Sequence, residues 1–318
     1  MSRVVVRSTK NEGVEGAVRS ILEKLNWKEI VKPSARVVIK LNLCEFDAKK
    51  VCNANTDPKV IYALVGKLKG QTKNITLVEA HSYRAPAEAA FKSTKIYELA
   101  DKLGVKVVNL SKSQARDVGN KLLGPMPEIV LDADVFITMP KLKTHALTYF
   151  TGSLKNQWGC VPRHDRIALH HSLDSLIVDI NGLLKPKLCI MDGIIGMDDR
   201  GPTNGRPRSL DIILGSTDPV ALDATAMRLV GLDPNKAKHV TLAYAAKQGS
   251  FKEEEIELDM DFMRDWADFK PAHLDWAIRT MNHMTRYRWF RDYVLSVNWI
   301  FYPTKLLVNI LRKMGIVR

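Results

Sequence analysis

Residues 36–43 of the chain read RVVIKLNL. The run is short, rich in β-branched side chains and apolar at almost every position, which predicts a strand buried on both faces of a sheet. A helix pattern, DPKVIYALVGKLKG, follows at 57–70, with Asp57 as a candidate N-cap and Pro58 suited to the first turn. Next come a strand pattern, NITLVEA, at 74–80 and a helical segment at 87–104 that closes at Gly104.

The same alternation continues on both sides of this core. Further strand patterns are RVVVRS (3–8), VKVVNLS (105–111), ADVFITMPKL (133–142), PKLCIMDGIIGM (186–197) and SLDIILGS (209–216). Helix patterns occupy 13–25 and 218–231. Short strands that alternate with helices predict an α/β fold, in which a mostly parallel sheet carries helices on both faces.

The chain changes character near residue 250. Residues 1–250 carry the α/β pattern, and we predict one domain there with a polar cleft at its strand ends. The stretch 251–266 is acidic, whereas 277–318 is basic and aromatic. Residues 251–318 are therefore predicted to form a C-terminal helical extension.

Composition and charge narrow the class of protein. Of 318 residues, 46% are hydrophobic and 26% charged, which predicts a folded protein and excludes a disordered tail. The net charge of +13 favours acidic partners, namely anionic metabolites, an anionic membrane surface or nucleic acid. No apolar run reaches the roughly 18 residues of a spanning helix. The opening MSRVVVRSTK lacks a secretory pattern, so we predict a cytoplasmic protein, with a peripheral place at the membrane as the alternative.

Polar side chains gather where the predicted strands end. In an open α/β sheet, ligands bind beyond the carboxyl ends of the strands. The residues at these ends are Lys40, Asn42, Cys44, Glu79, His81, Lys141, Lys143, His145, Asp192, Ser216 and Asp218. Each of them alone is most simply a loop or turn residue, but together they predict a site.

One window, 140–166, reads PKLKTHALTYFTGSLKNQWGCVPRHDR and sets five lysines and arginines and two histidines against one acid, Asp165. Bulky apolar residues stand among these cations, so the window must be partly buried, and a buried cation without a partner is costly. An anionic ligand bearing phosphate or carboxylate would complete the site, helped by backbone N–H groups at a helix start near Lys155. The alternative is that the lysines extend to water.

These residue types suggest roles. We predict that His145, which titrates near neutrality, moves a proton with Lys143 and Asp192 as the other catalytic residues. The predicted substrate-binding residues are Lys40, Asn42, Lys141, Lys155, Asn156, Arg163, Arg166 and Asp218. A divalent metal is an alternative, with His164, His171 and Asp192 as candidate ligands.

Several common cofactor sites have little support. The glycine-rich stretch DGIIGMDDRGPTNGRPR (192–208) would let backbone approach a ligand, but it is neither a Walker loop nor G-x-G-x-x-G, which disfavours an ordinary ATP or dinucleotide site. None of the four cysteines forms a C-x-x-C pair, which disfavours an iron–sulfur cluster. Cys44 and Cys160, near the predicted site, are either reactive thiols or inert buried ones.

Four stretches resemble a known family. They are VVIKLNL, DVFITMPKLKTHALTYFTGSLKNQWGCVPRHDR, LCIMDGIIGMDDRGPTNGRPR and ILGSTDPVALDATAMRLVGLD, and together they resemble the family described as domain of unknown function 362. The resemblance implies no particular reaction. It implies that recurring polar positions of the family are Lys40, Asn42, Lys141, Lys143, His145, Lys155, Asn156, Asp192, Asp218 and Asp223. Some relatives look like iron–sulfur proteins through an added cysteine module, which this chain lacks, and the lysines and histidines are also similar in style to those of lactate-racemase-like proteins.

Three classes of function stay open at this point. The first is an enzyme that acts on an anionic small molecule. The second is a protein that binds a membrane surface or nucleic acid through 277–318, where aromatic residues alternate with basic ones, or that packs this segment in a homodimer. The third is a redox or cluster-carrying protein that uses the scattered cysteines.

Overall fold

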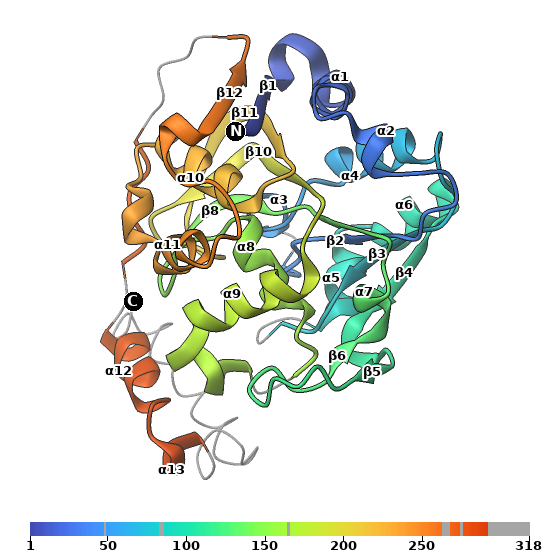
Figure 1. Ribbon diagram of the computed structural model, residues 1–318. Helices are drawn as coiled ribbons and strands as arrows, with labels where there is room; N and C mark the ends of the chain where they lie inside the picture. The colour runs from blue at the N-terminus through green and yellow to red at the C-terminus, as the bar shows by residue number, and fades with distance from the viewer. Residues whose placement is uncertain (48, 83–85, 164–165, 263–267, 274–275, 292–318) are drawn as a thin grey trace.

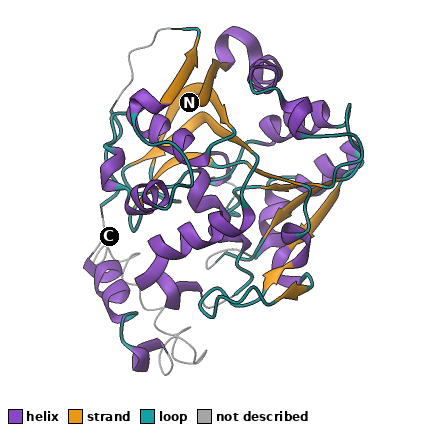
Figure 2. Ribbon diagram, viewed as in Figure 1, coloured by secondary structure: helices purple, strands orange, loops and turns teal. Residues whose placement is uncertain are grey.

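The computed structural model describes residues 1–47, 49–82, 86–163, 166–262, 268–273 and 276–291. A ten-stranded sheet runs through the molecule with helices on both faces, which confirms the predicted α/β fold (Figures 1 and 2). In spatial order the strands are β12 (Ile256–Met260), β1 (Ser2–Ser8), β11 (Arg206–Ser216), β10 (Leu188–Asp198), β7 (Val135–Thr138), β2 (Val37–Lys40), β3 (Ile75–Glu79) and β4 (Lys106–Asn109). Two more, β8 (Lys141–His145) and β9 (Tyr149–Phe150), extend it beside β10, and β5 (Ala115–Arg116) pairs separately with β6 (Met126–Pro127).

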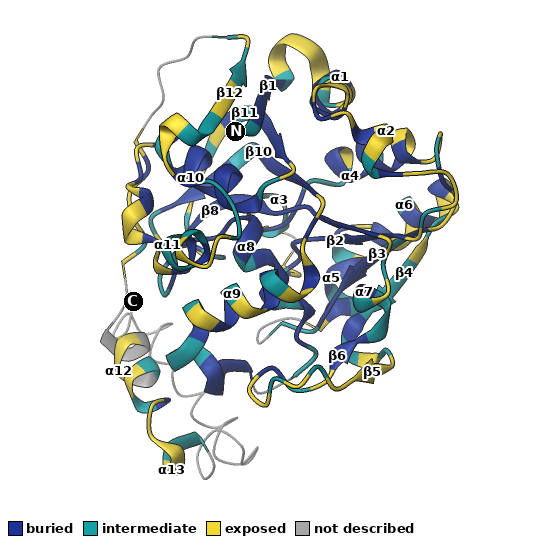
Figure 3. Ribbon diagram, viewed as in Figure 1, coloured by how far each residue is buried: buried dark blue, intermediate teal, exposed yellow. Residues whose placement is uncertain are grey.

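Each face of the sheet carries its own apolar layer. One face is covered by α1 (Thr9–Lys24), α4 (Pro58–Leu68), α5 (Ala87–Ser93) and α6 (Ile96–Leu103). The other is covered by α8 (Ser153–Asn156), α9 (Leu173–Leu184), α10 (Pro219–Leu229) and α11 (Lys238–Ala245). The strands between them are largely buried (Figure 3).

Short helical segments connect these elements. They are the α-helices α2 (Trp27–Ile30), α3 (Val51–Ala54) and α7 (Glu128–Leu131), and the 3₁₀ segments η1 (Leu110–Lys112), η2 (Gln157–Cys160), η3 (Arg166–Ser172), η4 (Pro234–Lys236) and η5 (Glu253–Glu255). Local signals in the sequence explain several boundaries. The Asp57 side chain accepts a hydrogen bond from the Lys59 N–H and so caps α4, as predicted, and Gly104 closes α6 in the left-handed conformation.

The alternation of side chains along β2 decides which face of the sheet its last residue, Lys40, points to. Val37 and Ile39 belong to the layer under α1 and α4, and Val38 belongs to the layer under α8 and α9. Because successive side chains of a strand point to opposite faces, Lys40 lies on the α8 and α9 side.

The strand β11 is antiparallel to both of its neighbours, so the sheet is not fully parallel. It pairs antiparallel with β10, and the stretch 199–205 connects the two strands. The glycine-rich stretch therefore serves this connection, where a Cβ on Gly201 would lie 2.0 Å from the Thr144 carbonyl oxygen. Since β11 is antiparallel to β10, and β10 is parallel to β7 and β2, the carboxyl end of β11 lies at the opposite end of the strands from Lys40. Asp218 lies at that opposite end.

The sheet also continues beyond residue 250, where the sequence suggested that the α/β domain ends. The strand β12 pairs in parallel with β1. Two helices follow, α12 (Trp276–Met284) and α13 (Arg288–Phe290), which lie apart from the sheet at the side of η3 (Figure 1). Of the predicted extension, 263–267, 274–275 and 292–318 lie outside the described residues.

The order of the parallel strands contains a switch point. From β2 the chain proceeds outward to β3 and then β4, and it returns to add β7 on the other side of β2. In open α/β sheets the ligand crevice lies beyond the carboxyl ends of the strands where the order reverses. Here those ends are Lys40 to Asn42 after β2 and Met139 to Lys141 after β7.

Candidate functional site

Two asparagines join the strand ends at the switch point. The Asn156 amide nitrogen donates to the Lys40 carbonyl at 3.2 Å and to the Thr138 hydroxyl at 2.8 Å, so α8 is tied to both β2 and β7. The Asn42 amide nitrogen donates to Asn156 Oδ1 at 3.0 Å. Both asparagines are buried. The structure therefore brings Asn42 and Asn156, two of the predicted site residues, into direct contact as parts of a frame.

Lys40 forms a buried ion pair. Its Nζ lies 2.5 Å from Glu79 Oε1, and the two side chains are 1% and 6% exposed. The backbone of η2 covers the pair, since a Cβ on Gly159 would lie 2.6 Å from Lys40 Nζ. Glycine at this position thus permits the close approach, and the charge of Lys40 is already matched by Glu79.

Lys141 and Asp192 form a second buried pair. Lys141 Nζ donates to Asp192 Oδ2 at 2.7 Å. The same carboxylate accepts the Asp57 N–H at 2.7 Å and the Ile194 N–H at 2.9 Å. The carboxylate of Asp192 is therefore well supplied with donors, and the pair ties β8, β10 and the start of α4 together.

Lys143 is held in place without a carboxylate. Its Nζ donates to Asn42 Oδ1 at 2.9 Å and to the Ala54 carbonyl at 2.6 Å, and it lies 3.1 Å from Cys44 Sγ. The side chain is 1% exposed. Among the residues that the structure describes, Lys143 therefore has no carboxylate partner.

Lys155 and Arg166 add two more cations that form no ion pair with a described carboxylate. The Arg166 guanidinium is buried and donates to the carbonyls of Trp158 and His81. The Lys155 amine is partly exposed and makes no hydrogen bond within the described chain. Burial, followed by the charge of Lys143, lowers the pKa of Lys155 from 10.5 to about 7. We call Lys143, Lys155 and Arg166 the cationic cluster.

Two histidines border the cationic cluster. Burial first, and then the charge of Lys155, lowers the pKa of His145 well below its usual value and that of His170 to about 3. His145 Nδ1 accepts the N–H of Leu147 at 3.1 Å. A neutral imidazole that accepts at Nδ1 carries its proton on Nε2, so His145 is built to donate a hydrogen bond from Nε2.

The start of α8 is already occupied by a carboxylate of the chain itself. Asp223 accepts the N–H groups of Ser153 at 2.6 Å and Leu154 at 3.0 Å. Burial raises the pKa of Asp223 to about 7. The backbone donors that the sequence suggested for an anionic ligand are thus taken, and the side chains of the cationic cluster remain.

Other predicted residues lie elsewhere. Asp218 caps α10 and also accepts from the Ser2 hydroxyl and the Ser250 N–H, and Arg163 donates to the Leu122 carbonyl between β5 and β6. His171 Nδ1 lies 3.0 Å from the Ala168 carbonyl, and His164 is outside the described residues. Within the part of the chain that the structure describes, no three His, Cys, Asp or Glu side chains gather where a metal ion could bind.

The sequence did not single out His239 and Asp174. His239 on α11 is fully buried, and its Nδ1 lies 3.7 Å from Asp174 Oδ1, an ion-pair distance rather than a hydrogen bond. Burial lowers the pKa of His239, and the charge of Lys155 acts in the same direction. A lone histidine in the pattern LDPNKAKHV gives no sign of this position.

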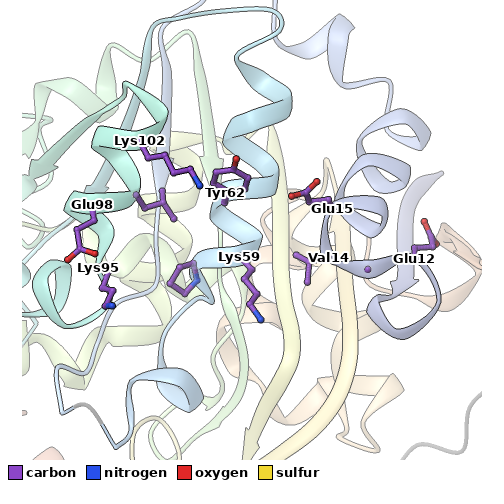
Figure 4. A pocket seen from close by; sticks show the side chains of 11 residues that line it. Glu12, Val14, Glu15, Lys59, Tyr62, Lys95, Glu98 and Lys102 are labelled. Atoms are coloured by element: carbon purple, nitrogen blue, oxygen red, sulfur yellow. The ribbon is translucent and has the colours of Figure 1, made fainter.

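A cavity of about 700 Å³ lies on the other face of the sheet, between α1, α4 and α6 (Figure 4). Its charged lining residues are Glu12, Glu15, Lys59, Lys95, Glu98 and Lys102. Three acids and three bases give this cavity no net charge. It therefore offers an anion no electrostatic advantage, in contrast to the cationic cluster.

Comparisons with known proteins place the chain in a family and find a relative. A family model described as "Domain of unknown function (DUF362)" matches residues 37–228. The chain is 28% identical over 227 residues to a thylakoid-associated protein of Synechocystis sp., which covers 69% of this chain and 70% of that protein.

Two solved structures share parts of the chain path. The lactate racemase apoprotein of Thermoanaerobacterium thermosaccharolyticum superposes with a TM-score of 0.48 at 9% identity, over 72% of this chain. A Thermotoga maritima protein superposes with a TM-score of 0.35 at 12% identity, over 74% of this chain. The chain spans only 56% and 59% of these two proteins, and neither likeness is close enough to transfer an activity.

Proposed function

Because the chain belongs to the domain of unknown function 362 family, whose description names no reaction, we propose its function from the geometry of its site. The proposal is an enzyme that binds a small molecule bearing carboxylate or phosphate at the cationic cluster. Lys155 would then act on that molecule as acid and base, with His145 as a hydrogen-bond donor. Lys40 and Lys141 would shape the site through their ion pairs with Glu79 and Asp192.

One observation carries this proposal. Two of the cations at this site, Lys40 and Lys141, have carboxylate partners. The other three, Lys143, Lys155 and Arg166, form no ion pair with a described carboxylate. Glu45, the acid that follows Cys44, instead accepts backbone N–H groups of its own loop. Uncompensated buried charge is destabilising, so a site that retains it at a switch point favours an anionic ligand.

The titration of Lys155 supports acid–base chemistry. With a pKa of about 7, the amine is about half neutral at neutral pH and can both accept and donate a proton. His145 would serve as a hydrogen-bond donor from Nε2, because the Nδ1 lone pair is engaged by the Leu147 N–H. The proton transfer that the sequence assigned to His145 is therefore proposed for Lys155.

Calorimetric titration with two simple probes, oxalate and inorganic phosphate, tests the binding step. Loss of one charge-assisted hydrogen bond costs about 1.5–3 kcal/mol, so Lys155→Met should weaken binding by roughly ten- to a hundredfold at about pH 6. The matched control is Lys67→Met, which removes the same charge from an exposed position on α4 and should leave affinity unchanged. Equal weakening by both variants would show that only the net charge attracts anions, and absence of binding in the wild type would remove the proposal.

A second candidate function rests on the C-terminal helices. Tyr287 and Trp289 are 46% and 51% exposed, and the neighbouring Arg286 and Arg288 are exposed as well. Aromatic and basic side chains together suit an anionic membrane surface, and a relative of this chain is described as thylakoid-associated. Within the described residues, no helix combines the length and apolar character needed to cross a membrane.

Co-sedimentation with vesicles tests this second function. Wild-type protein should sediment with vesicles that contain anionic lipid and less so with neutral ones. Trp289→Ser should reduce sedimentation, whereas Tyr97→Ser, an exposed aromatic on α6, should not. Equal sedimentation of all three proteins would remove the candidate. Homodimer formation and nucleic-acid binding through the same segment stay predictions.

A further inference from the structure

Lys155 differs from the three other lysines at the switch point. Lys40 and Lys141 each hold a carboxylate in a buried ion pair, and Lys143 has three polar atoms within 3.1 Å of its Nζ. The Lys155 amine makes no hydrogen bond within the described chain and reaches some solvent. It is therefore the one amine of the four that a ligand can approach without breaking a contact.

We propose that Lys155 forms an imine with the ketone carbonyl of a 2-oxo acid, a small molecule that carries a carboxylate beside a carbonyl group. The inference rests on the proposed function, because the same cations that hold an anion would hold the carboxylate of this substrate. It goes further by naming the substrate class and the nucleophile. A phosphate ester without a carbonyl group would bind to the cationic cluster but could not react.

The chemistry needs no group beyond those of the chain and the substrate. The lone pair of the neutral amine attacks the carbonyl carbon, the C–N bond forms, and the carbonyl oxygen takes up a proton to give a carbinolamine. The nitrogen loses one of its two protons, the hydroxyl takes up a proton and leaves as water, and the product is the iminium, the protonated form of the imine. No electron is gained or lost. The iminium then withdraws electrons from the neighbouring carbon, whose proton becomes easier to remove.

The surroundings of Lys155 suit each step. A nucleophilic lysine must be neutral, and a lysine beside other cations is neutral more often; burial and the charges of Lys143 and Arg166 lower the pKa of Lys155 to about 7. Lys143 and Arg166 would hold the carboxylate. His145, with its proton on Nε2, can donate to the carbonyl oxygen as negative charge develops there.

Reductive trapping tests the inference. Wild-type protein is incubated with pyruvate, the smallest stable 2-oxo acid, and sodium cyanoborohydride, and the modified lysine is located by peptide mass spectrometry. One adduct is expected at Lys155, at least about tenfold above any exposed lysine, because exposed amines with a pKa near 10.4 are almost fully protonated at neutral pH. Acetone, which has the carbonyl group but no carboxylate, should label Lys155 far less.

Two variants and one profile make the outcome decisive. Lys155→Arg should lose the adduct and Lys67→Arg should keep it. In the wild type, labelling at Lys155 should rise with pH through about 7. This measurement does not depend on whether a variant folds. Labelling that persists in Lys155→Arg, or that spreads over exposed lysines with no preference, overturns the inference.

Calorimetry with oxalate on the same preparation separates this inference from the proposed function. Oxalate carries two carboxylates and no ketone, so it reports the anion site alone. Oxalate binding without a pyruvate adduct overturns the imine and leaves the anion site standing. Absence of both oxalate binding and the adduct overturns both proposals.

Discussion

Replacing Lys155 by methionine should make the ligand-free protein more stable. Methionine keeps most of the apolar length of the side chain and removes the amine, which has no hydrogen bond in the described chain. The pKa of Lys155 falls from 10.5 to about 7 on folding, which corresponds to about 5 kcal/mol of free energy against the charged form. Because the amine reaches some solvent, we expect a gain of about 2–4 kcal/mol at neutral pH.

The gain should shrink as the pH rises. Between the folded pKa of about 7 and the ordinary value of 10.5, the unfolded chain binds more protons at Lys155 than the folded chain does. The unfolding free energy of the wild type therefore rises with pH across this window, relative to the variant. Below about pH 7, both states are protonated at this position, and the difference no longer changes with pH.

Urea denaturation at about pH 6, 8 and 10 measures this difference. The matched control, Lys67→Met, removes an exposed lysine from α4 and should change stability by less than about 0.5 kcal/mol. A Lys155→Met protein that is no more stable than the wild type at any of these pH values would refute the reasoning, because the amine would then be solvated or paired in the folded protein.

Three other predictions concern the frame of the site. A Cβ on Gly152 would lie 2.1 Å from Asp223 Oδ1, so Gly152→Ala should lower the unfolding free energy by about 1–3 kcal/mol in urea denaturation. The control, Gly66→Ala, lies in an exposed and open position of α4 and should raise it by about 1 kcal/mol. Similar effects of the two variants would contradict the close approach at Gly152. Glu79→Gln leaves Lys40 buried and unpaired, so thermal unfolding should show a loss of about 3–5 kcal/mol, and a loss below about 1 kcal/mol would argue against the buried pair. Burial raises the pKa of Asp223 from 3.8 to about 7, so between these pH values the folded chain binds more protons there than the unfolded chain, and stability falls as the pH rises. Asp223→Asn should remove that part of the pH dependence. Parallel stability profiles for the two proteins would contradict the raised pKa.

The sequence predicted the fold well where local patterns decide it. The apolar run after Arg36 became the central strand β2, and Asp57 and Gly104 begin and end helices as their chemistry requires. The direction of β11 could not be predicted in the same way, because a run such as SLDIILGS has the same pattern in either direction. The short glycine-rich connection before it was the available sign of an antiparallel pair.

The convergence of the site was predictable only in part. Polar strand ends in a parallel sheet predict that Lys40, Asn42 and Lys143 lie near one another, and their hydrogen-bond frame around Asn156 agrees. The partners of the lysines were not predictable, because Glu79 and Asp192 come from other strands. Once they are paired, the surplus charge rests on the cationic cluster, which the sequence could not distinguish from the rest.

The central claim is that Lys155 is a partly desolvated amine, without a partner in the described chain, that awaits an anion. Nitrogen-detected NMR of lysine-labelled protein, with Lys155→Arg to assign the signal, measures its pKa directly. A pKa of about 7 in the free protein, which rises when oxalate saturates the site, is the predicted result. A value near the ordinary 10.4 that oxalate does not move would contradict the account.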